Sequence, residues 1–99
     1  MEVVYAKDVK ARLINWKHND PILYRATERV LLAIQKDPVG FGNPGDPLVQ
    51  RLSSYAVDGR DAEYVVTWDV VGQQVRIITI SSRGELIQRA RFGTFSRGG

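Results

Sequence analysis

The 99-residue sequence contains no cysteine, and this absence excludes disulfide bonds, thiolate metal sites and a cysteine nucleophile. It also contains no run of about 18 apolar residues, so we expect no membrane-spanning helix. The N-terminal residues include Glu2 and no long apolar stretch, which is unlike a secretory signal. Together these absences lead us to expect a cytoplasmic protein.

Histidine and proline are scarce. His18 is the only histidine, and its place at the end of an expected helix favours a surface position over a role as general base. Three of the four prolines and three of the nine glycines lie within residues 38–47. No Gly-Lys-Ser/Thr follows them, so we expect a helix-to-strand connection and not a phosphate-binding loop. The sequence predicts no metal site and no cofactor.

The residues that are present are typical of one globular domain spanning residues 1–99, with 43% hydrophobic and 25% charged residues. The net charge of +3 is unevenly distributed. Residues 83–99 hold four arginines and one glutamate, whereas the first 82 residues hold ten basic and ten acidic side chains. We expect residues 84–99 to form a basic tail, which is either a surface for RNA or an acidic partner, or simply a solvated segment.

Helical periodicity follows a short strand predicted for residues 2–5. Apolar residues recur at helical spacing over residues 9–16, which predicts a helix with one core-facing stripe. Asp20 and Pro21 are residue types favoured at the N-cap and at the first position of a helix. We therefore expect a helical hairpin over about residues 7–36, joined by a very short connection.

The period changes to two in the second half of the chain, which predicts three strands in an antiparallel meander. The order β-α-α-β-β-β indicates an α+β fold with the helices on one face of the sheet. We expect Val66 and Trp68 to be buried on that face with Leu13 and Val30. Strict alternation in the last strand would group its side chains into two sets: Val75, Ile77 and Thr79 on one face, and Arg76, Ile78 and Ile80 on the other.

The order of these elements and several local strings resemble the RelE/ParE toxin superfamily of bacterial type II toxin–antitoxin systems. The similarity covers roughly residues 2–86. The strings that carry it are "YAKDVKARLINW" for the first strand and helix, "LLAIQKDPVGFGNPGDPLVQRL" for the second helix and the connection, and "EYVVTWDVVGQQVRIITISSR" for the hairpin and the last strand.

The resemblance implies a metal-independent endonuclease that cleaves messenger RNA on the ribosome and so inhibits translation. It also implies a cognate antitoxin whose acidic, partly disordered segment wraps the basic face. In ribonuclease members a basic residue after the last strand lies at the catalytic surface, and Arg83 falls on that position. Other members of the superfamily act by binding DNA gyrase and lack nuclease chemistry.

RNA cleavage by attack of a 2′-hydroxyl on the neighbouring phosphate needs a cation for the phosphorane and a group that accepts a proton. A guanidinium suits the first task and is too basic for the second. Glu85 is a candidate base or an ion-pair partner of Arg83, and Arg60 is a second candidate cation. We expect Arg83 to be accessible at the edge of a concave surface. Its expected lining is Arg60 with Arg89 or Arg91, and the candidate RNA- or partner-binding residues are Arg89, Arg91 and Arg51.

Two departures from the superfamily pattern leave other functions open. Its strand pair commonly reads Tyr-Arg where this chain has Tyr64-Val65, and Arg60 is flanked by Asp58 and Asp61. The alternatives are a gyrase-binding toxin of the ParE type and a non-toxic binding member of the superfamily.

Overall fold

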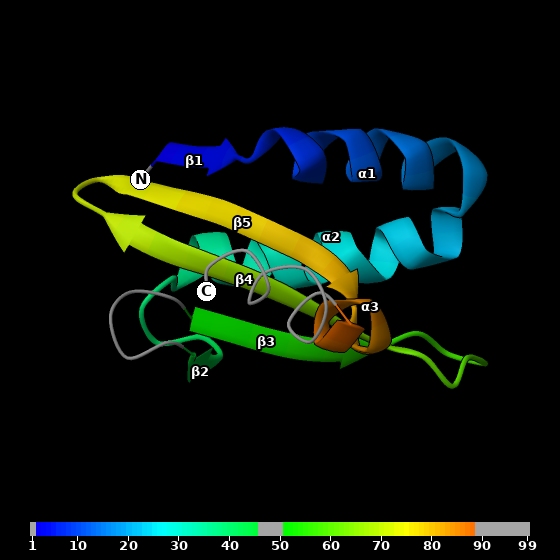
Figure 1. Ribbon diagram of the computed structural model, residues 1–99. Coiled ribbons are helices and arrows are strands. Elements are labelled where there is room, and N and C mark those ends of the chain that lie inside the picture. Colours follow the sequence, from blue (N-terminus) through cyan, green and yellow to red (C-terminus); the bar gives the residue numbers. More distant parts are fainter. Residues whose placement is uncertain (1, 46–50, 89–99) are drawn as a thin grey trace.

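The helices and strands predicted from the sequence are present in the computed structural model, which describes residues 2–45 and 51–88 (Figure 1). It adds two elements that the sequence did not predict, a two-residue strand in the proline-rich connection and a short helix at the start of the expected tail. The elements in chain order are β1 (Glu2–Tyr5), α1 (Lys7–Asn19), α2 (Pro21–Lys36), β2 (Asn43–Pro44), β3 (Arg51–Ala56), β4 (Glu63–Val71), β5 (Gln74–Ser82) and α3 (Arg83–Gln88).

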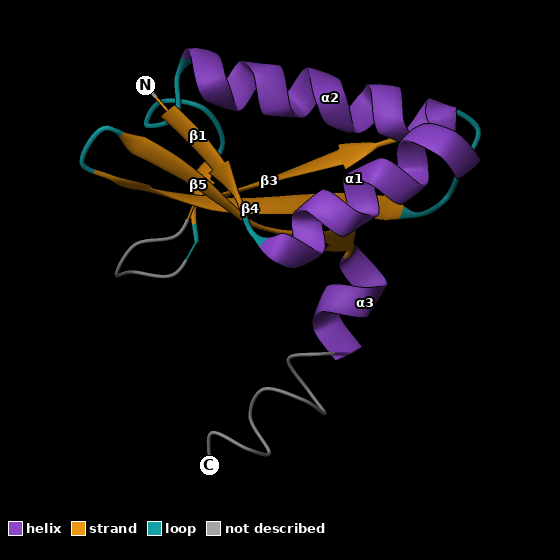
Figure 2. Ribbon diagram, turned by 90° about the horizontal axis from the view of Figure 1, so that it is seen from above, coloured by secondary structure: helices purple, strands orange, loops and turns teal. Residues whose placement is uncertain are grey.

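The strands form one five-stranded sheet in the order β1-β5-β4-β3-β2. Strands β3, β4 and β5 form the antiparallel meander that the sequence predicted. Strand β1 pairs with β5 in parallel, so the first and last strands of the described residues are neighbours. Helix α2 lies on one side of the sheet and α3 on the other (Figure 2). Val9 of α1 is buried in the same core cluster as Leu31 and Ile34 of α2, so α1 packs on the α2 side. The α+β fold with the helical hairpin on one face is therefore confirmed.

The helical hairpin turns at a single residue, Asp20. Its carboxylate accepts a hydrogen bond from the backbone N–H of Leu23 at 3.4 Å, and Pro21 occupies the first helical position, as the sequence predicted. The buried side of α2 carries Leu23, Thr27, Leu31 and Ile34, whose spacing of three to four residues keeps them on one stripe. None of the helices in the described ranges is long and apolar enough to cross a membrane.

The core lies between this hairpin and β4 and β5. Trp68 is fully buried, and its indole Nε1 donates a hydrogen bond to the backbone oxygen of Pro38 at 2.9 Å. Gly42 has a φ of +73°, and a Cβ there would come within 2.6 Å of the Trp68 ring. Val66 is also buried, with Leu13 and Val30 packed against the same cluster as predicted.

Strand β5 departs from strict alternation because it carries a β-bulge. Thr67 pairs with Thr79, yet Trp68 pairs with Ile77, so Ile78 is an extra residue. As a result Ile80 turns to the helix-facing core and is 2% exposed. Thr79 turns to the opposite face, where its hydroxyl lies 2.7 Å from that of Thr67. The predicted faces of Thr79 and Ile80 are therefore wrong, because the bulge reverses the alternation beyond residue 78.

Candidate functional site

Arg83 is the first residue of α3 and follows β5 directly. Tyr64 pairs with Ser82, and this register places Glu63 opposite Arg83 at the end of the sheet. The Nε of Arg83 donates a hydrogen bond to the Glu63 carboxylate, and the two side chains are 53% and 45% exposed. Arg83 is therefore accessible, as predicted, but its partner is Glu63, a residue that the sequence did not single out.

Glu85 points toward α1, where Arg12 donates to both of its carboxylate oxygens, one of the two bonds measuring 2.9 Å. The hydrogen bond to Glu85 raises the pKa of the Arg12 guanidinium above its usual value. The backbone N–H of Glu85 donates to the hydroxyl of Ser82 at 3.1 Å, which fixes the start of α3. Glu85 thus ties α3 to α1.

Arg60, in the loop between β3 and β4, binds the carboxylate of Asp20 through two hydrogen bonds of 2.8 and 2.6 Å. The hydrogen bond from Arg60 lowers the pKa of Asp20, and the bond to Asp20, followed by one to Tyr64, raises the pKa of Arg60. The sequence suggested Asp58 and Asp61 as the acidic neighbours of Arg60. The carboxylate that binds it instead comes from the turn between the two helices, 40 residues away.

Arg60 and Arg83 lie at the same end of the sheet but on opposite sides of it. Glu63 and Tyr64 are consecutive in β4, so their side chains point to opposite faces. The Tyr64 ring packs edge-on against Trp16 of α1, with centroids 6.1 Å apart, so Tyr64 and its neighbour Arg60 are on the helix side. Arg83, held by Glu63, is on the other side. Among the described residues, Arg60 and Arg83 therefore do not line one concave surface.

Arg51 supports the connection between α2 and β3. Its guanidinium donates to the backbone oxygen of Phe41 at 2.9 and 3.2 Å and to that of Gly42 at 3.2 Å. These carbonyl contacts hold the loop that covers Trp68, so Arg51 has a structural task in this fold. Arg89 and Arg91 lie outside the described residues.

An aromatic cluster lies beneath the Arg60–Asp20 pair. The rings of Tyr55 and Tyr64 are 5.9 Å apart, and the Tyr55 hydroxyl lies 2.6 Å from that of Thr27. Burial raises the pKa of Tyr55 to about 12, so the phenol stays protonated at neutral pH. Trp16 packs against the hydrophobic core and also contacts the Tyr64 ring, so it links the core to this cluster.

The site at Arg83 consists of a permanent cation beside a carboxylate, both half-exposed. Among residues 2–45 and 51–88, no group of three or more histidine and carboxylate side chains lies close enough to bind a metal ion. The sequence did not predict Glu63 as the partner of Arg83 because that pairing depends on the register of β4 and β5. The bulge at Ile78 shifts this register by one residue, so the alternation of side chains does not reveal it.

We compared the chain with protein-family models, curated proteins and solved structures, and none of them matches it.

Proposed function

We propose that this chain is a toxin of a type II toxin–antitoxin system, related to the RelE/ParE superfamily, and that it cleaves messenger RNA on the ribosome without a metal ion. Its partner would be an acidic antitoxin. The observation that carries the proposal is the Arg83–Glu63 pair at the exit of β5. The position is the one at which the resemblance implies a catalytic basic residue, and the carboxylate beside it supplies the second chemical function that cleavage needs.

In this reaction Glu63 accepts the proton of the ribose 2′-hydroxyl as the 2′-oxygen forms a bond to phosphorus. Arg83 donates hydrogen bonds to the phosphorane oxygens, where its fixed charge stabilises the transition state more than the ground state. The bond from phosphorus to the 5′-oxygen then breaks. This leaves a 2′,3′-cyclic phosphate and a 5′-hydroxyl. The 5′-oxygen takes its proton from water, and Glu63 returns the proton it accepted to water.

Glu63 contacts Arg83 through Nε, so a phosphate that is to use this donor as well requires the ion pair to open. Exposed ion pairs contribute only about 0–1 kcal/mol, because solvent screens both charges. A phosphate diester presents the same pair of acceptor oxygens to a guanidinium as a carboxylate does. The half-exposed pair is therefore compatible with exchange of Glu63 for a substrate phosphate, which would leave the Glu63 carboxylate beside the ribose.

A second candidate function is that of a toxin that binds DNA gyrase without cleaving RNA. Two observations favour it. Arg60 is bound to Asp20 on the helix side of the sheet, so it cannot share a phosphate with Arg83 in this arrangement. Val65 occupies the position at which the superfamily commonly has an arginine.

The deciding experiment is induction of the wild type, Arg83→Ala and Glu63→Gln in a host that lacks the antitoxin, with growth and new RNA ends measured together. We expect the wild type to be toxic and to generate RNA ends that both variants lose. Lys10→Ala is the control, because it removes one exposed positive charge from α1, away from the site. Equal toxicity of all four proteins without new RNA ends would exclude cleavage. Inhibition of supercoiling by purified gyrase would then identify the second function.

A further inference from the structure

The outward face of α2 carries a continuous stripe of apolar and basic side chains, which we call the α2 stripe. Its members follow one another at intervals of three and four residues, so they share one side of the helix. All are exposed, and the two apolar members are 58% and 57% exposed. The opposite side of α2 packs on the sheet. The α2 stripe consists of Ile22, Arg25, Arg29, Leu32 and Lys36.

Within the part of the chain that the structure describes, the basic members of the α2 stripe form no ion pair with a carboxylate. Neither Arg25 nor Arg29 makes an ion pair or a side-chain hydrogen bond with any residue within the described ranges. They lie one helical turn apart, so their charges add on the same part of the surface. An unneutralised basic surface of this kind attracts an acidic ligand.

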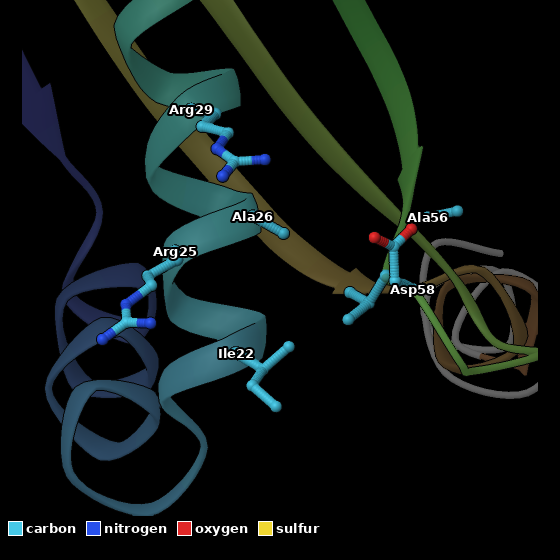
Figure 3. Close-up of a pocket in the computed structure, with 7 residues that line it drawn as sticks. Ile22, Arg25, Ala26, Arg29, Ala56 and Asp58 are labelled. Carbon is cyan, nitrogen blue, oxygen red and sulfur yellow. The ribbon is translucent and has the colours of Figure 1, made fainter.

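A groove adjoins the N-terminal half of the α2 stripe. It has a volume of about 230 Å³ and lies between α2 and the end of β3. Figure 3 shows Ile22 and Ala26 pointing toward the segment that carries Asp58, whereas the guanidinium of Arg25 points away from that segment. The groove therefore offers two apolar and two basic side chains on its α2 wall and a carboxylate on the opposite wall. An acidic ligand would be repelled by Asp58 and would place its charges over Arg25 and Arg29.

We propose that the α2 stripe and this groove bind an acidic amphipathic helix of a partner protein. An apolar side chain of that helix would enter the groove beside Ile22, and its carboxylates would bind Arg25 and Arg29. From Ile22 to Lys36 the α2 stripe is about 21 Å long, enough for several turns of a partner helix packed along it. Two large apolar side chains within a basic surface favour a protein ligand over RNA, because phosphates would leave them uncovered. This inference holds whether or not the chain is a toxin.

The test is a selection of helical peptides from a random phage-displayed library on the wild-type protein, with the double variant Arg25→Glu/Arg29→Glu used to remove peptides that bind elsewhere. We expect the recovered peptides to carry Leu, Ile or Met and Asp or Glu at heptad spacing. A selected peptide should bind the double variant about tenfold or more weakly than the wild type, since reversal of two charges replaces two attractions by repulsions. The control Lys7→Glu/Lys10→Glu makes the same change of charge on α1 and should leave the affinity unchanged.

A second pair of substitutions separates a protein ligand from RNA. Ile22→Ser/Leu32→Ser should weaken binding of the selected peptide while circular dichroism shows an intact fold. Recovery of no peptide, or of peptides that bind wild type and Arg25→Glu/Arg29→Glu equally, would overturn the proposal. Tighter binding of a single-stranded oligouridine than of any selected peptide, abolished by the arginine reversal and unaffected by Ile22→Ser/Leu32→Ser, would identify the surface as an RNA contact instead.

Discussion

The end of the sheet around Arg83 and the outer face of α2 both gather basic side chains, but only the first of these regions supplies them with carboxylates. At the end of the sheet each arginine is bound to an acidic residue from another element. On the α2 stripe the two arginines have no such partner in the described residues. We call the first region the paired end. Its ion pairs are Arg83 with Glu63, Arg60 with Asp20, and Arg12 with Glu85.

The difference shows that the position of a charged residue in the sequence does not indicate whether it is already in an ion pair or is open to a ligand. The excess charge lies in the C-terminal segment, which drew attention to Arg83 and the residues after it. Arg25 and Arg29 lie in the part of the chain with balanced charge, yet neither forms an ion pair with any residue that the structure describes. A ligand at the paired end competes with an existing carboxylate for the arginine it binds, whereas a ligand on the α2 stripe does not.

The largest expected effect concerns cleavage at the paired end. Arg83→Ala should lower kcat for messenger cleavage in a reconstituted translation system by about 10²–10³, as loss of one oxyanion donor does. Glu63→Gln should lower it by about 10²–10⁴, the range of general base catalysis. KM should change little, because both groups act mainly in the transition state. If Lys10→Ala lost as much activity as Arg83→Ala, the paired end would have no special part in cleavage.

The next effect concerns the stability that the Arg60–Asp20 pair adds. Asp20→Ala removes both the N-cap of α2 and the ion pair, and should lower the melting temperature by several degrees. Asp20→Asn keeps a good N-cap and should lower it less, so the difference between the variants separates the cap from the charge. Thermal unfolding followed by circular dichroism measures both variants.

The difference in stability between the wild type and Asp20→Asn should also depend on pH, and the direction follows from the pKa of Asp20. The folded state lowers the pKa of Asp20, so its stabilising contribution is present above about pH 4, where the unfolded carboxyl is also ionised. It is lost as the pH falls through the lower pKa of the folded state. The wild type should therefore approach Asp20→Asn in stability in acid, and a constant gap between them from neutral pH down to strong acid would contradict this assignment.

A smaller effect is expected in alkali from the aromatic cluster beneath this pair. The pKa of Tyr55 is raised to about 12, so between its ordinary value near 10 and about 12 the unfolded state loses its proton first. Stability should therefore fall as the pH rises through this window, by about 1 kcal/mol given the partial exposure of the side chain. Urea unfolding at pH 9 and at about pH 11 should show this fall in the free energy of unfolding for the wild type and not for Tyr55→Phe. Loss of the hydrogen bond to Thr27 in Tyr55→Phe would lower its stability at both pH values alike.

The smallest effect is expected on the α2 stripe. Arg25→Ala and Arg29→Ala should each change the free energy of unfolding by no more than about 0.5 kcal/mol, because neither side chain has a partner to lose. Urea unfolding at neutral pH measures this. A loss as large as that of Asp20→Ala would show that the two regions do not differ in the way described above.

Local features of the sequence predicted most of the fold. Asp20 and Pro21 marked the turn of the helical hairpin, and the apolar alternation of residues 64–70 marked the central strand with Trp68 in the core. These features depend on residues that are close in sequence, where spacing and capping chemistry suffice. Helix α3 was missed because it is short and lies where a charged tail was expected.

The candidate site could be predicted only in part. The resemblance directed attention to Arg83, and its exposure is as expected. Its pairing with Glu63, and that of Arg60 with Asp20, depend on contacts 20 and 40 residues apart in the chain. No local pattern distinguishes Glu63 or Asp20 from other acidic residues near an arginine. Such pairs are set by the strand register and by where the helical turn meets the sheet, which are properties of the assembled fold.

The bulge at Ile78 has a consequence for the alignment of this chain with related sequences. Without Ile78, strand β5 would be a regular alternating strand with the same partners in β4, so the bulge is equivalent to a one-residue insertion. A relative with an unbroken strand would align correctly only with a gap at this residue. An ungapped alignment would move every later position by one residue, so that Ser82 would stand where Arg83 belongs.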